Sequence, residues 1–316
     1  MPQTISGPRV IELPGYTCLA FNEDSKGEPV VLIHGLISSV YFWHPPHLSV
    51  FGDRPVYAIA LPGHYPSASL SGSERIDAER LTDALFEQIH ALIGNRRCVL
   101  VGHSTGGQAA LFAATRRPGQ ILGVVAMGSA LTGQEDNGVY AAFQWLATRM
   151  GRTGRSLVAT VLKLNALAEP IHRLFMRDVV ASPRIFFAHA DFPAYLQAYF
   201  PAMQRICRRS MGIYFRDLVA LDLTPHLASL RCPTLVLCGN QDPYVSIQRT
   251  HQLADAIPGS EKVFIDGSGH MPMFENWPEY SKAMASFMQR IEDACQTKPQ
   301  DLADRGYPPI SAALSS

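Results

Sequence analysis

The stretch CVLVGHSTGG at residues 98–107 decides the predicted fold of this chain. The apolar run CVLV is typical of a central strand, and TGGQAALFAATRR, residues 105–117, continues it as a helix. Between them the pattern G-x-S-x-G places Ser104 on a sharp turn, where the flanking glycines remove side chains that would clash. The Ser104 hydroxyl then stands at the carboxyl end of the strand, and the helix N-terminus favours developing negative charge. Ser104 is the candidate nucleophile; the alternative is a Gly-rich turn whose serine only caps the helix.

Outward from this stretch, eight short β-rich runs alternate with helical stretches. The runs cover residues 9–13, 17–21, 29–35, 56–63, 98–104, 121–128, 234–242 and 262–270. Such alternation is typical of an α/β fold with a mostly parallel sheet and helices on both faces. The first two runs are the exception, because the Pro14-Gly15 turn is too short for a parallel crossover and makes them antiparallel. Helices are expected at residues 79–93, 105–117, 247–256 and 279–295.

Between residues 133 and 225 the strands stop, and helical patterns rich in aromatic side chains take over. A loop of that length without structure of its own is uncommon in a compact domain. We therefore expect a helical cap at 133–225, a core formed by 1–132 and 226–296, and a C-terminal tail at 297–316. The insertion leaves and rejoins the sheet near the edge that carries Ser104, so the cap is expected to lie over that edge.

The composition is that of a globular protein without net charge. Lys plus Arg and Asp plus Glu each number 27 in 316 residues, and 47% of the residues are hydrophobic. A neutral chain has no electrostatic reason to hold nucleic acid or an anionic membrane, so the expected partner is a small-molecule, apolar substrate. The chain has no run of about 18 apolar residues, so no membrane-spanning helix is expected.

Several further patterns are missing from the sequence. The N-terminus has no basic region followed by an apolar core, and the six cysteines form no C-x-x-C pair, which favours a reducing, cytoplasmic location. No G-x-x-x-x-G-K-[ST], no H-E-x-x-H and no G-x-G-x-x-G after a strand is present, so no nucleotide or metal cofactor is expected. The sequence carries no signal for an oligomeric state.

A serine hydroxyl needs a base to remove its proton, usually a histidine oriented by a carboxylate. His270 is the candidate among eleven histidines, because Gly267 and Gly269 let its loop bend toward the sheet edge. His103 is adjacent to the serine, but neighbouring side chains at such a turn point in different directions. No signal for this role accompanies His34, His64, His172 or His251.

Asp242 is the candidate carboxylate, because it follows the run TLVLCG and so lies at the same sheet edge. The chain order Ser, Asp, His fits a triad on an α/β sheet, and the spacing to His270 leaves room for one helix and one strand. Taken alone, Asp242 is also compatible with a turn-forming role before Pro243. The other carboxylates considered are Asp266, Glu135 and Asp136.

The sequence HGL at residues 34–36 follows the buried run PVVLI and supplies a fourth element. Acyl transfer needs two preorganised N–H donors that face the oxyanion of the tetrahedral intermediate. We expect these donors to be the backbone N–H groups of Leu36 and Thr105, the latter directly after the nucleophile. Taken alone, Gly35 fits an ordinary strand-to-helix turn better than it fits a loop that supplies an oxyanion donor.

Five segments follow one another along the chain in an order that is typical of a known family: HGLISSVYFW, LPGHYPS, VGHSTGG, GNQDPYV and GSGHMPMFENWPE. Over most of residues 10–295 the chain resembles the α/β-hydrolase superfamily, in particular its capped esterase-like and peroxidase-like members. The resemblance implies Ser104 as nucleophile, Asp242 as acid and His270 as base, with Leu36 and Thr105 as oxyanion donors. A serine at position 104 argues against the dehalogenase and epoxide-hydrolase branches, which use aspartate there.

Two positions depart from the family pattern. The loop that usually reads D-x-P-G-H-G-x-S reads ALPGHYPS at residues 60–67, so Tyr65 replaces a glycine and is expected to reshape the pocket wall. Ser246 stands where a proline often follows D-P-x-V. Neither departure touches the predicted triad.

The predicted activity is serine hydrolysis of an ester, with thioester, lactone or amide as alternatives, through an acyl-enzyme on Ser104. The same fold and triad also support carbon–carbon bond hydrolysis, acyl transfer, lyase or cofactor-free oxygen chemistry. A non-enzymatic ligand-binding protein is a further alternative. Although cap aromatics equally fit helix packing, substrate contacts are expected from Phe143, Trp145, His34 and Met271.

Overall fold

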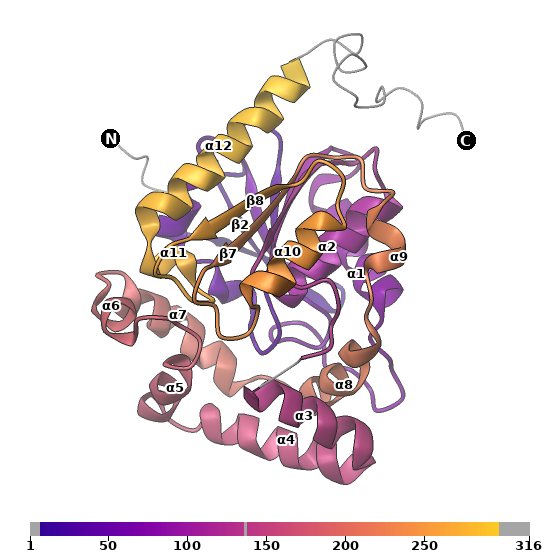
Figure 1. Ribbon diagram of the computed structural model, residues 1–316, viewed down its shortest axis with the longest axis vertical. Helices are drawn as coiled ribbons and strands as arrows, with labels where there is room; N and C mark the ends of the chain where they lie inside the picture. Colours follow the sequence, from indigo (N-terminus) through magenta and orange to yellow (C-terminus); the bar gives the residue numbers. More distant parts are fainter. Residues whose placement is uncertain (1–6, 136–137, 297–316) are drawn as a thin grey trace.

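The computed structural model describes residues 7–135 and 138–296, built around an eight-stranded sheet with the spatial order β1-β2-β4-β3-β5-β6-β7-β8 (Figure 1). The strands are β1 (Arg9–Leu13), β2 (Tyr16–Phe21), β3 (Val30–Ile33), β4 (Val56–Ile59), β5 (Cys98–His103), β6 (Ile121–Met127), β7 (Thr234–Gly239) and β8 (Glu261–Ile265). Strands β3 to β8 run parallel to one another, and β2 is antiparallel to both β1 and β4. The predicted sheet is confirmed, including the antiparallel first pair.

The central strands are buried on both faces, which is why they appear in the sequence as continuous apolar runs. In β3, Val31 and Ile33 belong to one core cluster, and Val30 and Leu32 belong to the other. This alternation follows from the two-residue period of a strand. Each face of the sheet therefore requires its own layer of helices.

Helices α1, α2, α9 and α10 contribute to the cluster on one face, whereas α12 and the 3-10 helix η2 contribute to the cluster on the other (Figure 1). Their bounds are α1 (Ala78–Ile93), α2 (Thr105–Arg116), α9 (Thr224–Leu227), α10 (Ile247–Asp255), α12 (Trp277–Gln296) and η2 (Pro45–Phe51). Three short elements complete this part of the chain: η1 (Val40–Phe42), η3 (Leu218–Ala220) and α11 (Pro272–Glu275). Elements η1, η2 and α11 are not expected from the sequence pattern.

Side-chain caps set several helix boundaries. The Asp77 side chain accepts a backbone N–H of the first turn of α1 at 2.8 Å, and Gly94 ends that helix with φ at 62°. Helix α1 therefore starts one residue before its predicted start. The Ser246 hydroxyl caps α10 in the same way at 3.3 Å, so this departure from the family pattern starts a helix. Helix α12 begins at Trp277, two residues earlier than predicted.

Helices also fill the segment between β6 and α9, where the sequence predicts a helical cap, and they gather at one end of the sheet (Figure 1). Helices α3, α4 and α8 extend the cluster of α1 and α2, while α6 and α7 extend the cluster of α12, so the segment packs continuously with both layers. The bounds are α3 (Gly138–Arg149), α4 (Gly151–Asn165), α5 (Glu169–Met176), α6 (Pro183–Ala188), α7 (Phe192–Gln204) and α8 (Arg208–Asp217).

The domain boundaries 1–132, 133–225 and 226–296 stay a prediction, and the predicted tail at 297–316 lies outside the described residues. None of the described helices combines the length and the apolar character that crossing a membrane requires.

Candidate active site

Ser104 stands on the strained turn that the sequence predicts between β5 and α2. Its backbone has φ 53° and ψ −121°, a left-handed conformation that residues with a side chain rarely adopt. A Cβ on Gly102 would lie 2.3 Å from the carbonyl oxygen of Gly106, and one on Gly106 would lie 2.3 Å from that of Ile33. Both glycines are therefore required by close backbone contacts, and they leave the Ser104 side chain partly exposed between buried neighbours.

Asp242 and His270 are brought together from the ends of β7 and β8. The Nδ1 atom of His270 lies 2.6 Å from Oδ2 of Asp242, and both side chains are buried. The other carboxylate oxygen of Asp242 accepts the backbone N–H groups of Tyr244 and Val245 at 2.8 and 2.9 Å. The carboxylate is thus fixed in orientation before it meets the imidazole.

The electrostatics of this pair suit a base and its orienting acid. Burial alone lowers the pKa of His270, but the charge of Asp242 and its hydrogen bond outweigh burial and leave the pKa raised from 6.5. Burial raises the pKa of Asp242, but the His270 charge and three hydrogen bonds outweigh it and leave the pKa lowered from 3.8. The carboxylate is therefore ionised across the physiological range, and it stabilises the imidazolium form of His270.

Gly128 connects the histidine to the serine turn. The carbonyl oxygen of Met127 accepts the backbone N–H of Ser104 at 2.8 Å, and Gly128 follows with φ at 55°. A Cβ on Gly128 would lie 2.9 Å from Cε1 of His270 and 3.4 Å from Oδ2 of Asp242. The end of β6 therefore contacts Ser104 on one side and the His270–Asp242 pair on the other, which places all three predicted triad members at one sheet edge.

The loop that carries His270 is held by the segment between α5 and α6. The His270 backbone N–H donates to the carbonyl oxygen of Val179 at 2.9 Å. The Glu275 carboxylate accepts the backbone N–H of Gly269 at 2.7 Å and that of Ser182 at 2.9 Å. Burial raises the pKa of Glu275, against the effect of these donors. Glu275 is not among the residues predicted from the sequence, although an acidic side chain within the largely apolar run MPMFENW was a signal for it.

The other candidate residues for the base and acid lie in different environments. His103 is buried, its Nε2 pairs with the carbonyl oxygen of His270 at 2.8 Å, and burial lowers its pKa to about 3. Asp266 accepts the side-chain amide of Asn240 at 2.8 Å on the surface. Glu135 pairs with Arg249. Asp136 lies outside the described residues.

The segment that carries the predicted oxyanion donors packs directly on the serine turn. A Cβ on Gly35 would lie 3.0 Å from Cβ of Ser104, so only glycine allows this approach without displacement. Ile37 has φ at 52°, a strained conformation for a β-branched residue, and it turns the chain sharply after Leu36. Within the described part of the chain, the backbone N–H groups of Leu36 and Thr105 donate no hydrogen bond. Two donors thus remain available beside the serine.

The predicted substrate-contact residues differ in placement. His34 is fully buried and holds the loop, because its ring nitrogens pair with the Gly35 carbonyl oxygen and the Leu61 N–H. Met271 is buried directly after His270. Phe143 is buried with its ring 5.3 Å from that of Phe215, and Trp145 is 58% exposed. Most aromatic side chains of the inserted helices are likewise buried in the two core clusters.

Three tyrosines that are not among the predicted site residues lie near the predicted triad and the loop after β3. The Tyr244 ring meets the His270 ring edge-on at 5.3 Å, and Tyr140 of α3 stacks on Tyr244 at 4.7 Å. Tyr199 of α7 donates its hydroxyl hydrogen to the carbonyl oxygen of Ile37, 3.3 Å away. Tyr244 could have been selected from the sequence because it lies two residues after Asp242. In the inserted helices, no sequence signal distinguishes side chains that line a pocket from those that pack in a core.

The sequence matches a known family over most of its length. Residues 30–283 match the alpha/beta hydrolase family. A curated relative, the (E)-2-((N-methylformamido)methylene)succinate hydrolase of Acinetobacter baylyi, is 24% identical over 295 residues, which cover 89% of this chain and 98% of that protein.

Solved structures share the fold. A thermophilic esterase from Thermogutta terrifontis has a TM-score of 0.65 and 20% identity, with coverage of 92% of this chain and 99% of the esterase. A 2-hydroxy-6-oxo-6-phenylhexa-2,4-dienoate hydrolase from a Rhodococcus species has a TM-score of 0.67 and 19% identity, with coverage of 90% and 100%. The family match, the eight-stranded sheet and these structural neighbours lead to one conclusion: the chain belongs to the alpha/beta hydrolase family.

Proposed function

We propose that this hydrolase cleaves an ester of a small, largely apolar molecule through an acyl-enzyme on Ser104. The observation that carries the proposal is the 2.6 Å contact between His270 and Asp242 at the sheet edge where Ser104 stands on its strained turn. The family relationship supports hydrolysis, and the choice of an ester bond is our inference from the serine nucleophile.

In the proposed reaction the Ser104 oxygen attacks the acyl carbon, and its proton passes to Nε2 of His270. Asp242 keeps Nδ1 protonated and stabilises the imidazolium that forms. The negative oxygen of the tetrahedral intermediate accepts the backbone N–H groups of Leu36 and Thr105. The C–O bond to the alcohol then breaks, and His270 gives its proton to the leaving oxygen. A water molecule, deprotonated by His270, releases the acid and restores Ser104.

The expected substrate is apolar because aromatic side chains surround the predicted triad. On one side, Tyr244 contacts His270, and Tyr140 stacks on Tyr244. On the other, Tyr199 contacts the loop of residues 34–37, which carries the proposed donor Leu36 and is called the oxyanion loop below. Phe143 stands behind Tyr140, with ring centroids 6.3 Å apart, so it would act on substrate choice through that ring. Trp145 is mostly exposed, which weakens the case for its direct contact with substrate.

The inserted helices would act as a cap that excludes water from the acyl-enzyme, a role supported by the contacts of Val179 and Tyr199 with the His270 loop and the oxyanion loop. A cytoplasmic location is supported by cysteines that are free throughout the described residues.

A panel of esters with graded acyl length tests the proposed function. Wild type should hydrolyse the esters with a burst of alcohol equal to the enzyme concentration, and Ser104→Ala should give no burst. Ser281→Ala, on the far helix α12, serves as the matched control and should keep both burst and turnover. If wild type left every ester intact, ester hydrolysis would be rejected, and carbon–carbon hydrolysis or ligand binding on the same scaffold would take its place.

A further inference from the structure

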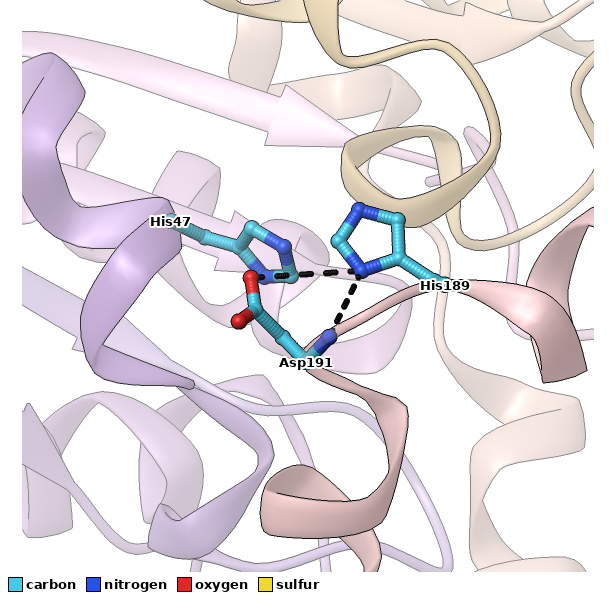
Figure 2. A group of neighbouring side chains, drawn as sticks. All are labelled: His47, His189 and Asp191. Carbon is cyan, nitrogen blue, oxygen red and sulfur yellow. Dashed lines mark hydrogen bonds and ion pairs between the residues drawn. The ribbon is translucent and has the colours of Figure 1, made fainter.

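Three side chains from two distant segments converge where η2 meets the turn between α6 and α7. They are His47 of η2 and, from that turn, His189 and Asp191. One potential metal-ligating atom from each residue lies within 4.8 Å of the other two. Figure 2 shows the two imidazole rings and the carboxylate facing a common space. We call this group the His47 cluster.

Among the residues that the structure describes, no lysine or arginine forms an ion pair with Asp191 of the His47 cluster. The His47 side chain is only 6% exposed, and its Nε2 has no hydrogen-bond partner among the described residues. Leaving a buried polar atom without a partner is unfavourable, because the atom loses its hydrogen bonds to water. The Nδ1 atom of His189 accepts the backbone N–H of Asp191 at 3.2 Å, so it carries a lone pair, and it faces the Asp191 carboxylate oxygen at 3.9 Å. The carboxylate oxygen of Asp191 thus faces an imidazole nitrogen whose lone pair makes only a 3.2 Å hydrogen bond, and a cation between them would bind the carboxylate and replace that N–H as the partner of the nitrogen.

Packing fixes the two imidazoles in their positions. The Phe274 ring lies 4.2 Å from the His47 ring and 5.5 Å from the His189 ring. Trp277 covers His47 from α12, with ring centroids 5.4 Å apart. Because these apolar contacts hold both rings, a bound ion would not have to order them first.

We propose that His47, His189 and Asp191 bind a Zn²⁺ ion that ties the α6–α7 turn to η2. Two imidazoles and a carboxylate are a ligand set that zinc accepts, and the fourth position would hold water on the open side of the cluster. With bonds of about 2.1 Å, ligand atoms around tetrahedral zinc are about 3.4 Å apart. Ligand atoms that now lie within 4.8 Å of one another would therefore need to approach by up to about 1.4 Å. The sequence shows no motif for this site because its ligands come from segments more than 140 residues apart. The site is independent of the reaction proposed at Ser104.

Zinc titration of the protein, produced without a polyhistidine tag and freed of metal, tests this site. Calorimetry should show one Zn²⁺ bound per chain, Zn²⁺ should raise the melting temperature, and Co²⁺ should give the visible absorption of a tetrahedral site. Mg²⁺, which prefers oxygen ligands, should do none of these. His47→Gln and Asp191→Asn should each weaken zinc binding at least about tenfold.

His172→Gln is the matched control, because His172 is also buried with an unpartnered Nε2 but lies outside the cluster. It should bind zinc as wild type does. Asp191 is 37% exposed at its side chain, so Asp191→Asn keeps the test valid even if His47→Gln fails to fold. Absence of saturable zinc binding, or equal binding by wild type and Asp191→Asn, would overturn the proposal.

A second observation concerns a cavity of about 1000 Å³ between residues 69–72 and helices α4 and α8. Five arginines line it, and no carboxylate does: Arg152, Arg155, Arg205, Arg208 and Arg209. Arg205 donates to the Tyr65 hydroxyl at 2.6 Å, and the other four form no ion pair within the described residues. Guanidinium groups that face one space repel one another, and an anion in that space would relieve the repulsion.

We infer that this arginine cavity binds a small molecule that carries a diphosphate group. Guanidinium forks pair with phosphate oxygens two at a time, which makes arginine the preferred residue for such groups. Ile206, Ile213 and Leu70 supply an apolar wall for the remainder of the ligand. A cavity of this size admits a small molecule.

Titration with inorganic pyrophosphate tests the arginine cavity. Wild type should bind it saturably, and the double variant Arg155→Gln/Arg208→Gln should bind at least about tenfold more weakly, since hydrogen bonds between charged groups are the strong ones. The control is Arg184→Gln, an exposed arginine of α6 outside the cavity, which should bind as wild type does. Equal binding by the double variant and the control, or no saturation in wild type, would contradict the inference.

Discussion

His270 and Asp242 are 28 residues apart in the chain, and yet Nδ1 of the first lies 2.6 Å from Oδ2 of the second. The contact follows from the sheet, because β7 and β8 are parallel neighbours and both loops leave from the same edge. Each partner is held separately: Asp242 by the backbone N–H groups of Tyr244 and Val245, and His270 by its bond to Val179. The pair is thus set by the fold before any substrate binds.

Replacing Asp242 by Asn should lower kcat about 10⁴-fold, because the amide no longer enforces the imidazole tautomer that accepts the serine proton. The comparison variant is Asp266→Asn, whose carboxylate bonds to Asn240 on the surface and should keep most of the activity. Steady-state kinetics on one ester would measure both. A dead Asp266→Asn with an active Asp242→Asn would reverse the assignment.

The pH dependence of kcat/KM should report the raised pKa of His270. Only the neutral imidazole accepts a proton, so activity should rise with pH and level off above a pKa higher than 6.5. In Asp242→Asn the burial that lowers the pKa stays, and the charge that raises it is lost. The residual activity of that variant should therefore level off at a lower pH than wild type. If kcat/KM levelled off at the same pH in both proteins, Asp242 would not control the pKa of His270.

Gly128→Ala should impair catalysis more than stability. The added methyl group would lie 2.9 Å from the His270 ring, and φ at 55° adds backbone strain. Because the ring must move away from Asp242 or Ser104, we expect kcat to fall by at least about tenfold, or about 1.4 kcal/mol. Gly119→Ala has open space around the new methyl group and should behave as wild type. Equal kcat for the two variants would refute the close packing of Gly128 on His270.

Glu275→Gln should destabilise the fold by about 1–3 kcal/mol. Glu275 accepts two backbone N–H groups in a buried position, and a glutamine has only one oxygen to offer them. Glu279→Gln is the matched control, because Glu279 accepts one N–H at an exposed position, where effects are usually within about 0.5 kcal/mol. Urea denaturation gives both values. A change as small as that of the control would mean that Glu275 does not hold the His270 loop.

The sheet could be predicted from the sequence because each strand is a short apolar run and the G-x-S-x-G turn leaves few alternatives for its surroundings. The proximity of Asp242 and His270 could be predicted because both follow strands of the same parallel sheet. These predictions depend on local sequence pattern and on strand order, and both can be inferred from the sequence alone.

Other features depend on contacts between distant segments and could not be found that way. Glu275 accepts the backbone N–H of Ser182 across 93 residues, and the Tyr199 hydroxyl donates to the Ile37 carbonyl oxygen across 162. Aromatic side chains in the inserted helices have the same composition whether they face a pocket or a core. For this reason the sequence could not show that Trp145, which was expected to contact substrate, is 58% exposed. Nor could it show that Tyr140 stacks on Tyr244.

The most direct test of the central claim is the site of covalent labelling by a fluorophosphonate. The Ser104 oxygen should displace fluoride from phosphorus, and the mass increment should be found on the peptide that contains residues 98–116. Ser104→Ala should gain no mass under the same conditions, and Ser281→Ala should be labelled at the wild-type rate. An increment on another residue, or an undiminished increment in Ser104→Ala, would contradict the account of a serine hydrolase built on Ser104.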